Sequence, residues 1–442
     1  MAEIAPFRGI LYDPKKAGRA DRLLAPPYDV INDADRARLA ALDPHNCVRL
    51  ILPKDAQGGD SDGKYAEAAR ELNAWLDEGV LRRDDAPALY RYHQIFKEPG
   101  EGGARTFTRK GFICRIRLRR FDEGVVLPHE RTLAGPKADR LKLKRATRCH
   151  LSQVFGLYSD PERSTDAPFE KLEREAPLLD GTTTDGVTQR LWRLTDAASQ
   201  NKVVAALADK KVYIADGHHR YETMLALRDE LRAESGGNPR SSVEFGTIFL
   251  ANMDDPGLLV FPTHRVVHGL ESFDFARLIE GARAFFTADE LKVTNAAAVR
   301  AELAERGRRA PTFAAARGNR IVYLTLRGDV DLTRVPSLVG PQVVRQLDVT
   351  LLHALIIEYV LGIDRAAQER QTNLRYVKDT AAALAEAGAP GVQAVFVMNP
   401  TPVAQVKAVA DAGEVMPQKS TFFYPKLASG LVLNPIVPSE EA

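Results

Sequence analysis

Cysteine is scarce in this chain of 442 residues, which contains only Cys47, Cys114 and Cys149. The number is odd and no pair has CxxC spacing, and both facts argue against a disulfide framework and against a zinc site. Two catalytic signatures are missing as well. No G-x-x-x-x-G-K-[ST] segment occurs, so a P-loop is absent, and no G-x-S-x-G nucleophile turn occurs.

Long apolar runs and a surplus of one charge are also missing. No run approaches the roughly 18 residues that span a bilayer, and residues 1–6 lack the basic and apolar regions of a secretory signal. The 61 basic and 59 acidic residues leave a net charge of +2, which gives no reason to expect nucleic-acid binding. We therefore expect a cytoplasmic protein without membrane contact. The sequence carries no signal of oligomeric state.

What is present is the composition of a soluble globular protein, with 45% hydrophobic and 27% charged residues. The length predicts two or three domains. The pattern of strand-like and helix-like segments changes after Gly269, which suggests a domain boundary between 1–270 and 271–442. Strand-like and helix-like patterns alternate throughout, which predicts an α/β or α+β fold.

The expected elements follow from periodicity and turn residues. Predicted helices cover 33–42, 65–81, 221–231, 273–285, 296–306, 348–362 and 381–387. Predicted strands cover 47–52, 88–96, 109–118, 212–215, 243–252, 258–260, 291–293, 321–326 and 392–398, with a hairpin turn at 99–103. Asp33 and Thr401 are the expected helix caps, and Leu72 and Trp75 are the expected buried face of their helix.

The most informative segment stands between the predicted strand 212–215 and the helix that follows it. It consists of Asp216, Gly217, His218, His219 and Arg220. Backbone N–H groups, a helix dipole, imidazoles and a guanidinium at one point favour an anion, phosphate above all. The alternative is a polar turn whose Asp216 caps the helix. A metal site is not expected, because no carboxylate or cysteine stands at ligand spacing.

A second polar segment begins with His129 and Glu130, beside Pro128 in a predicted loop. A carboxylate beside an imidazole can act as a general base or as a magnesium ligand. The basic run that follows, which includes Lys137 and Arg140, could hold nucleotide phosphates. Its alternative interpretation is a solvated helix face.

Three further segments could add contacts to a ligand. The stiff turn at 26–29 presents the carboxylate of Asp29, and His264 and Arg265 directly follow a strand. The loop 416–427 carries potential anion donors, namely Lys419, Ser420, Thr421 and Lys426. That loop could close over a ligand or could be a strap that packs its aromatic residues on the core.

Taken together, these segments resemble DUF1015, a prokaryotic family of proteins of unknown function. The matching stretches are 25–30, 129–132, 136–137, 139–141, 214–221, 262–265, 416–421 and 424–426. They run in order over nearly the whole chain, so the resemblance is specific, although it implies no particular activity.

The turn at 216–220 also resembles the nucleotide-binding turn of the ParB/sulfiredoxin superfamily, which includes free-serine kinases. This resemblance implies a mixed-sheet nucleotide-binding core, here with an additional α+β part toward the C-terminus. In those kinases the turn binds phosphates and a glutamate deprotonates the serine hydroxyl. The turn residues carry over one for one, whereas the glutamate has no matching motif here. Glu130 is the candidate by its chemistry, and Asp29 is the second.

The favoured hypothesis is a small-molecule kinase that transfers a phosphoryl group from ATP or ADP, with Mg²⁺, to a small hydroxyl metabolite such as free serine. Glu130, Asp29 and His219 are its predicted catalytic residues. Residues 216–220, Lys137 and Arg140 would bind the nucleotide. His129, His264, Arg265, Lys419, Ser420 and Thr421 would bind the acceptor. The alternatives are a non-catalytic nucleotide-responsive regulator or DNA-binding ParB-like protein, and a phosphate-ester hydrolase.

Overall fold

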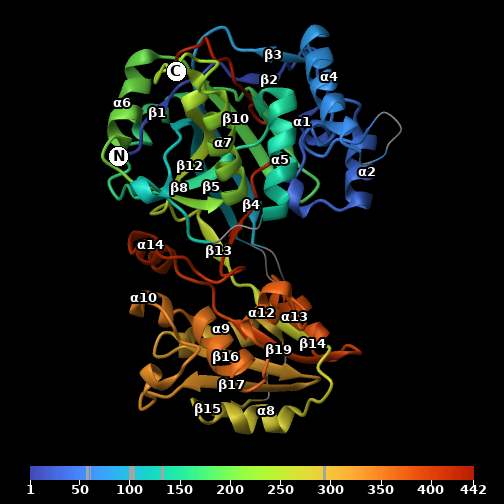
Figure 1. The fold of residues 1–442 in the computed structure, drawn as a ribbon, viewed down its shortest axis with the longest axis vertical. Coiled ribbons are helices and arrows are strands. Elements are labelled where there is room, and N and C mark those ends of the chain that lie inside the picture. The colour runs from blue at the N-terminus through green and yellow to red at the C-terminus, as the bar shows by residue number, and fades with distance from the viewer. Residues whose placement is uncertain (56–58, 60, 99–104, 131–133, 292–294) are drawn as a thin grey trace.

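The computed structural model describes residues 1–55, 59, 61–98, 105–130, 134–291 and 295–442. Two sheets with their helices form two units that are stacked along the long axis of the molecule, and both termini lie in the first unit (Figure 1). Within the described part of the chain, no helix is long and apolar enough to cross a membrane. The predicted α/β or α+β class, with a mixed sheet in the first unit, is confirmed.

The first unit contains a mixed sheet of nine strands. Its order is β6 (Val126–Leu127), β11 (Val212–Asp216), β8 (Val154–Tyr158), β12 (Phe245–Asn252), β5 (Thr106–Arg117), β4 (Leu89–Lys97), β10 (Thr188–Leu194) and β9 (Leu179–Thr182), with β1 (Ile4–Ala5) beside β5. The pairs β11–β6 and β12–β8 are parallel, and the others are antiparallel. Its helices are α1 (Ala20–Leu23), α2 (Asp33–Leu42), α3 (Val48–Ile51), α4 (Gly63–Asp77), α5 (Ala134–Thr147), α6 (Ala197–Leu207) and α7 (His218–Leu231).

Strand β12 shows why this sheet lies inside the protein. All eight of its residues are buried, so the strand reads as a continuous apolar run. Ile248 on one face packs in a cluster with Val203 of α6 and Tyr221 of α7. Phe249 on the other face belongs to a cluster that includes Phe423 and reaches the second sheet. The two units therefore share one apolar core.

The second unit contains six antiparallel strands. Their order is β15 (Phe286–Glu290), β17 (Arg320–Leu326), β16 (Thr312–Arg317), β19 (Val392–Met398), β14 (His264–His268) and β18 (Leu374–Val377). Its helices are α8 (Phe275–Ala282), α9 (Ala296–Gly307), α10 (Gln342–Arg345), α11 (Asp348–Leu351), the π-helix η7 (Leu352–Glu358), α12 (Arg365–Arg370), α13 (Thr380–Glu386) and α14 (Val403–Asp411).

The chain crosses between the units more than once. Strand β14 already belongs to the second sheet, and β13 (Leu259–Phe261) before it pairs with β20 (Phe422–Tyr424). After β20 the chain returns to the first unit, where β21 (Asn434–Pro435) pairs with β7 (Cys149–His150) and Leu433 bonds to Ile10 in β2 (Ile10–Tyr12). Strand β2 in turn pairs with β3 (Leu81–Arg83). The boundary at residue 270 stays a prediction.

Several expectations for single elements need correction. The predicted strand 47–52 is wrong, because Val48–Ile51 form helix α3; the Asn46 side chain accepts a hydrogen bond from Val48 N at 2.9 Å and starts the turn. Short buried apolar runs do not distinguish strand from helix. Thr401 is not a cap, since Pro402 occupies that position and the Thr401 hydroxyl donates to the Ser420 carbonyl at 2.9 Å.

Other expectations about elements are confirmed. Leu72 and Trp75 are both buried on α4. Helix α2 spans the predicted residues, although Asn32 rather than Asp33 caps it. Strands β4 and β5 pair antiparallel as the predicted hairpin requires. The turn at 99–103, positions 131–132 of the His129 motif and most of the predicted strand 291–293 lie outside the described residues.

Candidate anion-binding site

The turn at 216–220 joins β11 to α7 at the junction of the two units. Gly217 occupies the N-cap position with φ of 90°, a left-handed conformation that favours glycine. A Cβ atom at this position would lie 2.8 Å from Nε of Arg220. The alternative in which Asp216 caps the helix does not apply, because no side chain caps α7.

Asp216 instead forms two ion pairs. Its Oδ2 atom pairs with the Arg220 guanidinium, and its Oδ1 atom pairs with the Lys426 ammonium. Burial alone would raise the pKa of this carboxyl group. The charges of Lys426 and Arg220 outweigh that effect and hold the pKa well below its usual range. Asp216 is therefore a fixed anion that orients two cations.

Arg220 points into the protein. Its guanidinium donates to the Gln153 carbonyl as well as to Asp216, and its side chain is buried. The buried Lys144 ammonium donates to the Arg220 carbonyl at 3.0 Å. In this arrangement Arg220 fixes Asp216 and the start of α7 through its protein contacts.

The rings of His129 and His218, both predicted site residues, lie next to each other beside the turn. Their ring centroids are 4.7 Å apart, and the His129 N–H group donates to Nε2 of His218 at 3.3 Å. His129 Nδ1 donates to the Ile214 carbonyl at 2.5 Å, which leaves Nε2 to accept from the Thr421 hydroxyl at 2.9 Å. Burial lowers the pKa of both rings, so both are neutral at pH 7. His219, the neighbour of His218, is partly exposed.

The C-terminal segment 416–427 lies against this pair of histidines. Met416 N donates to the His129 carbonyl at 2.8 Å, and the Phe423 ring lies 6.0 Å from the His129 ring. Ser420 is buried and its hydroxyl donates to the Pro417 carbonyl at 2.5 Å. Lys419 is exposed and has a left-handed backbone. The segment is thus a packed strap that presents its lysines.

Lysine side chains converge here from both units. The Lys378 ammonium, between β18 and α13, lies 3.8 Å from the centroid of the Phe422 ring, and the Lys426 ammonium lies 5.0 Å from the same centroid. Partial burial and the charges of Lys426 and Lys419 lower the pKa of Lys378. Asp29 and Asp216 act on it in the opposite direction. An anion placed among these three ammonium groups would relieve their mutual repulsion.

Lys378 was not among the predicted residues. It lies on a short segment that follows an edge strand of the other unit, where a single lysine has no distinguishing pattern. Its only sequence signal is its position between a strand and the Asp379 cap of α13.

The two candidate bases lie in different segments of the first unit. Asp29 is exposed on the 3-10 turn η1 (Tyr28–Val30), and its charge acts on Lys378. Glu130 forms a backbone bridge with Met416 and is partly exposed, with a carboxylate oxygen 3.8 Å from Nε2 of His129. Glu130 thus borders the strap, and the charge of Asp29 acts on a lysine of the cluster.

The remaining predicted residues lie further from the lysine cluster. Lys137 pairs with Glu222 at 2.5 Å. Arg140 pairs with Asp139, donates to the Ile51 carbonyl at 2.5 Å and stacks 4.2 Å from the centroid of the Tyr28 ring. It lines a cavity of about 210 Å³ together with Tyr28 and residues of α2.

His264 and Arg265 lie in the second unit. His264 is buried, with Nε2 donating to the Thr380 hydroxyl at 3.0 Å and Nδ1 accepting from Met398 N at 3.2 Å. Arg265 is also buried and donates to the Lys419 carbonyl at 3.2 Å. Both ring nitrogens of His264 are thus used by the protein, while Arg265 supports the strap.

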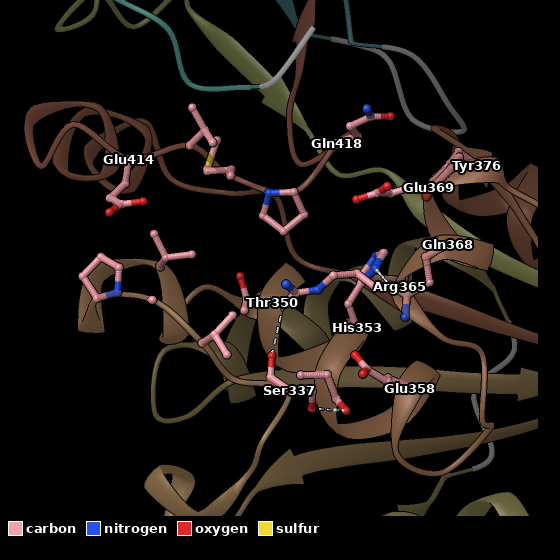
Figure 2. A pocket seen from close by; sticks show the side chains of 18 residues that line it. Ser337, Thr350, His353, Glu358, Arg365, Gln368, Glu369, Tyr376, Glu414 and Gln418 are labelled. Atoms are coloured by element: carbon pink, nitrogen blue, oxygen red, sulfur yellow. Dashed lines mark hydrogen bonds between the residues drawn. The ribbon is translucent and has the colours of Figure 1, made fainter. Parts of the chain in front are cut away.

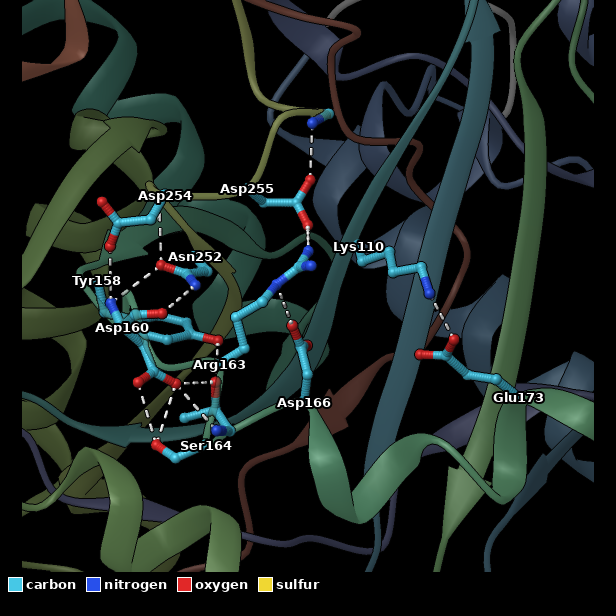
Figure 3. Close-up of polar contacts among 12 residues, drawn as sticks. Lys110, Tyr158, Asp160, Arg163, Ser164, Asp166, Glu173, Asn252, Asp254 and Asp255 are labelled. Carbon is cyan, nitrogen blue, oxygen red and sulfur yellow. Dashed lines mark hydrogen bonds and ion pairs between the residues drawn. The ribbon is translucent and has the colours of Figure 1, made fainter.

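A separate polar network at the ends of β8 and β12 satisfies its own charges (Figure 3). Asp160 accepts from Thr165 N at 2.9 Å and from the Ser164 hydroxyl at 3.0 Å. Arg163 pairs with Asp255 at 2.8 Å. This network stabilises the loop after β8 and differs from the lysine cluster, where cations outnumber carboxylates.

The chain is thus an α/β protein of two sheet units, with lysine side chains gathered beside the turn at 216–220. A model of the family described as "Protein of unknown function (DUF1015)" matches residues 4–350, and the chain belongs to that family. No curated protein matches the sequence.

Solved structures resemble the chain at low identity. A free serine kinase in complex with ADP gives a TM-score of 0.34 at 11% identity, over 71% of this chain and 87% of that chain. A conserved hypothetical protein from Pyrococcus furiosus gives 0.32 at 14% identity, over 71% and 90%. SbnI with C-terminal truncation from Staphylococcus aureus gives 0.32 at 11% identity, over 73% and 87%.

Proposed function

We propose that the protein transfers a phosphoryl group from a nucleotide, ATP or ADP, to the hydroxyl group of a small metabolite, with free L-serine as the first candidate. The observation that carries this proposal is that Lys378 and Lys426 share the Phe422 ring beside the turn at 216–220, with the charge of Lys419 also acting on Lys378. Phosphoryl transfer requires positioned phosphates and neutralised charge, and three ammonium groups beside a helix N-terminus can provide both.

The reaction can be written with the residues at this junction. The acceptor oxygen attacks the terminal phosphorus while the bond from phosphorus to the bridging oxygen breaks, and the shortened nucleotide leaves. The hydroxyl proton passes to a carboxylate, for which Asp29 and Glu130 are the candidates. The lysines stabilise the charge that develops on the phosphoryl oxygens. Asp216 and Arg220 keep Lys426 and the turn in place.

Magnesium fits this site with a minimal set of protein ligands. In the described part of the chain, no three His, Cys, Asp or Glu residues are grouped to hold a metal by themselves. Magnesium at nucleotide sites needs only one or two carboxylates, besides phosphate oxygens and water. Asp216 is occupied by its two cations, so Asp29 and Glu130 are the residues that fit. A bound Mg²⁺ would supply charge neutralisation at the phosphates.

The test is to incubate the purified protein with ATP or ADP, Mg²⁺ and a panel of hydroxyl metabolites headed by L-serine. We expect the phosphorylated acceptor and the shortened nucleotide in equal amounts. If no metabolite in the panel leads to consumption of either nucleotide, the kinase proposal fails. Phosphate release without an acceptor would instead support a phosphate-ester hydrolase built on the same lysines.

Two matched variants then distinguish the candidate bases. D29N and E130Q each remove one carboxylate charge at nearly constant volume. The base is the residue whose loss lowers kcat by about 100-fold or more while nucleotide affinity changes little. If both variants retain the wild-type kcat, neither residue is the base.

A further inference from the structure

Two buried polar residues of the first sheet face the strap and have no part in the chemistry described so far. Gln94 of β4 and Arg109 of β5 stand directly opposite each other on paired strands, and both are 0% exposed. Tyr92, two residues before Gln94, belongs to the apolar cluster that contains Phe423 of the strap. Because alternate residues of a strand share a face, Gln94 and Arg109 lie on the side of the sheet that the strap covers.

Arg109 is buried without a counter-charge. Among the described residues no carboxylate pairs with it, and its Nε and Nη1 atoms have no hydrogen-bond partner. Its guanidinium lies 4.5 Å from the centroid of the Phe155 ring. Burial lowers the pKa of Arg109 to about 10, so the group is still charged at pH 7. Apolar side chains of similar volume often replace buried charges without loss of stability, so stability alone does not account for this arginine.

The hydrogen bonds of the two residues meet at one point of the strap. Nη2 of Arg109 donates to the Pro425 carbonyl at 2.6 Å and also to the side-chain oxygen of Gln94. Nε2 of Gln94 donates to the Lys426 carbonyl at 2.9 Å. The carbonyl groups on both sides of the Lys426 Cα atom are therefore bound to the first sheet. We call Gln94 and Arg109 the clamp.

Arg109 also determines the direction of the Gln94 amide. A guanidinium group only donates hydrogen bonds, so the side-chain oxygen of Gln94 must face Arg109 and its NH₂ group must face the strap. Without the guanidinium the amide could reverse, and its oxygen would then oppose the carbonyl oxygen of Lys426. Arg109 thus acts on the strap directly at Pro425 and indirectly through Gln94.

The two ends of the strap have different surroundings. Met416 and Gln418, near its start, line a cavity of about 290 Å³ in the second unit (Figure 2). At its other end the Lys426 ammonium pairs with Asp216 and lies 5.0 Å from the centroid of the Phe422 ring. The place of this ammonium beside the turn depends on how the backbone of Lys426 is held, and the clamp holds it.

We infer that Gln94 and Arg109 are positioning residues for the Lys426 ammonium. They fix the backbone on both sides of Lys426, so that its side chain reaches Asp216 in one arrangement. A misplacement of about 1 Å in a site that transfers a group can cost about 100-fold in rate. That consequence for phosphoryl transfer rests on the proposed function, whereas the placement of the ammonium against Asp216 does not.

The test compares the reactivity of the Lys426 amine in the wild-type protein and in Q94M/R109M. Trace labelling of the full chain with acetic anhydride and mass spectrometry give its reactivity relative to Lys211, which pairs with Asp411 at the surface. Two methionines fill a similar volume without the hydrogen bonds of the clamp, so the urea midpoint should stay near that of the wild type. The reactivity ratio should nevertheless rise about fivefold, the equivalent of one neutral hydrogen bond, because an amine that leaves Asp216 reacts faster.

Two single variants extend this comparison. Q94M removes the donor to the Lys426 carbonyl and keeps Arg109, and it should also raise the ratio. It replaces the double variant if circular dichroism shows that the double variant is unfolded. R109K keeps a cationic donor for the Gln94 oxygen, so its ratio should lie closer to that of the wild type than the ratio of Q94M/R109M.

The matched control is Q200M. Gln200 is a buried amide of α6 that donates to the Pro87 and Leu194 carbonyls, each at 2.9 Å and outside the strap. Q200M should leave the Lys426 ratio unchanged. The inference is overturned if Lys426 reacts equally in the wild type and in the folded clamp variants, or if Q200M raises the ratio as much as they do.

Calorimetry with ADP on the same proteins separates this inference from the proposed function. The labelling needs no nucleotide, so a raised ratio supports the clamp even if the wild-type protein binds no ADP, a result that would reject the proposed function alone. If the wild type binds ADP, Q94M/R109M should raise the Kd by about tenfold, because a charge-assisted contact is displaced. An unchanged ratio together with wild-type ADP binding overturns the clamp and leaves the proposed function standing.

Discussion

The Lys426 ammonium is paired with the Asp216 carboxylate across 210 residues of sequence. The C-terminal segment follows the second unit in the chain. This ion pair holds it against the turn between β11 and α7. The same lysine lies near the Phe422 ring, where it meets Lys378. One ion pair thus links the shape of the turn, the strap and the lysine cluster.

Removing Lys426 should destabilise the protein. K426A leaves a carboxylate that is only 12% exposed with one of its two cations missing. Breaking a buried ion pair costs about 3 kcal/mol, because the remaining charge stays desolvated. Urea unfolding should show this loss, and the double variant D216N/K426A should recover part of it. The matched control is K142A, whose pair with Asp62 is exposed and should change stability by less than about 1 kcal/mol.

Removing Lys378 or Lys419 should weaken nucleotide binding with little effect on folding. Neither ammonium has an ion pair among the described residues, so each is available to phosphate oxygens. We expect K378A and K419A each to raise the Kd for ADP by about tenfold, the size of one charge-assisted hydrogen bond. Calorimetry at two salt concentrations measures this. K171A removes an exposed lysine that is distant in sequence from Lys378 and Lys419, and it should leave the Kd unchanged. Equal affinities in all three variants would remove the lysines from the site.

The hydrogen bond between Thr421 and His129 should stabilise the folded protein by holding the strap in place. T421V removes the hydroxyl that donates to Nε2 of His129, and this buried acceptor is then left without its partner. The expected cost is about 1 kcal/mol of unfolding free energy, and T421S should restore it. Nitrogen chemical shifts of His129 should still report a protonated Nδ1, because its bond to the Ile214 carbonyl remains. A change of tautomer would contradict the assigned geometry.

Sequence reasoning pointed to the turn and the strap of the candidate site but not to Lys378. The turn at 216–220 has a local signature, and His129 and Thr421 are brought to it as neighbours of the same strap. Lys378 could not be identified, because it approaches from a different sheet and only the tertiary fold shows that it shares the Phe422 ring with Lys426.

The roles of single residues depended on packing in a similar way. Arg220 looked like a phosphate ligand, but the fold directs its guanidinium to Gln153 and Asp216. The predicted strand at 47–52 was wrong because its apolar residues are buried equally well on one turn of helix. Alternating strands and helices were predictable from periodicity, whereas the return of the chain to β7 through β21 depends on long-range pairing that no local pattern indicates.

His264 should make stability depend on pH in the mildly acidic range. Burial lowers its pKa to about 4 in the folded protein, from 6.5. Between these values the unfolded chain binds a proton that the folded chain does not, so this contribution to stability falls as the pH falls from about 6.5 to about 4. One such histidine accounts for about 3 kcal/mol over that range. Urea unfolding of wild type and H264N at pH 7.5, 6 and 5 should therefore show a shallower loss in the variant. A constant difference at all three pH values would mean that H264N loses only the hydrogen bonds to Thr380 and Met398.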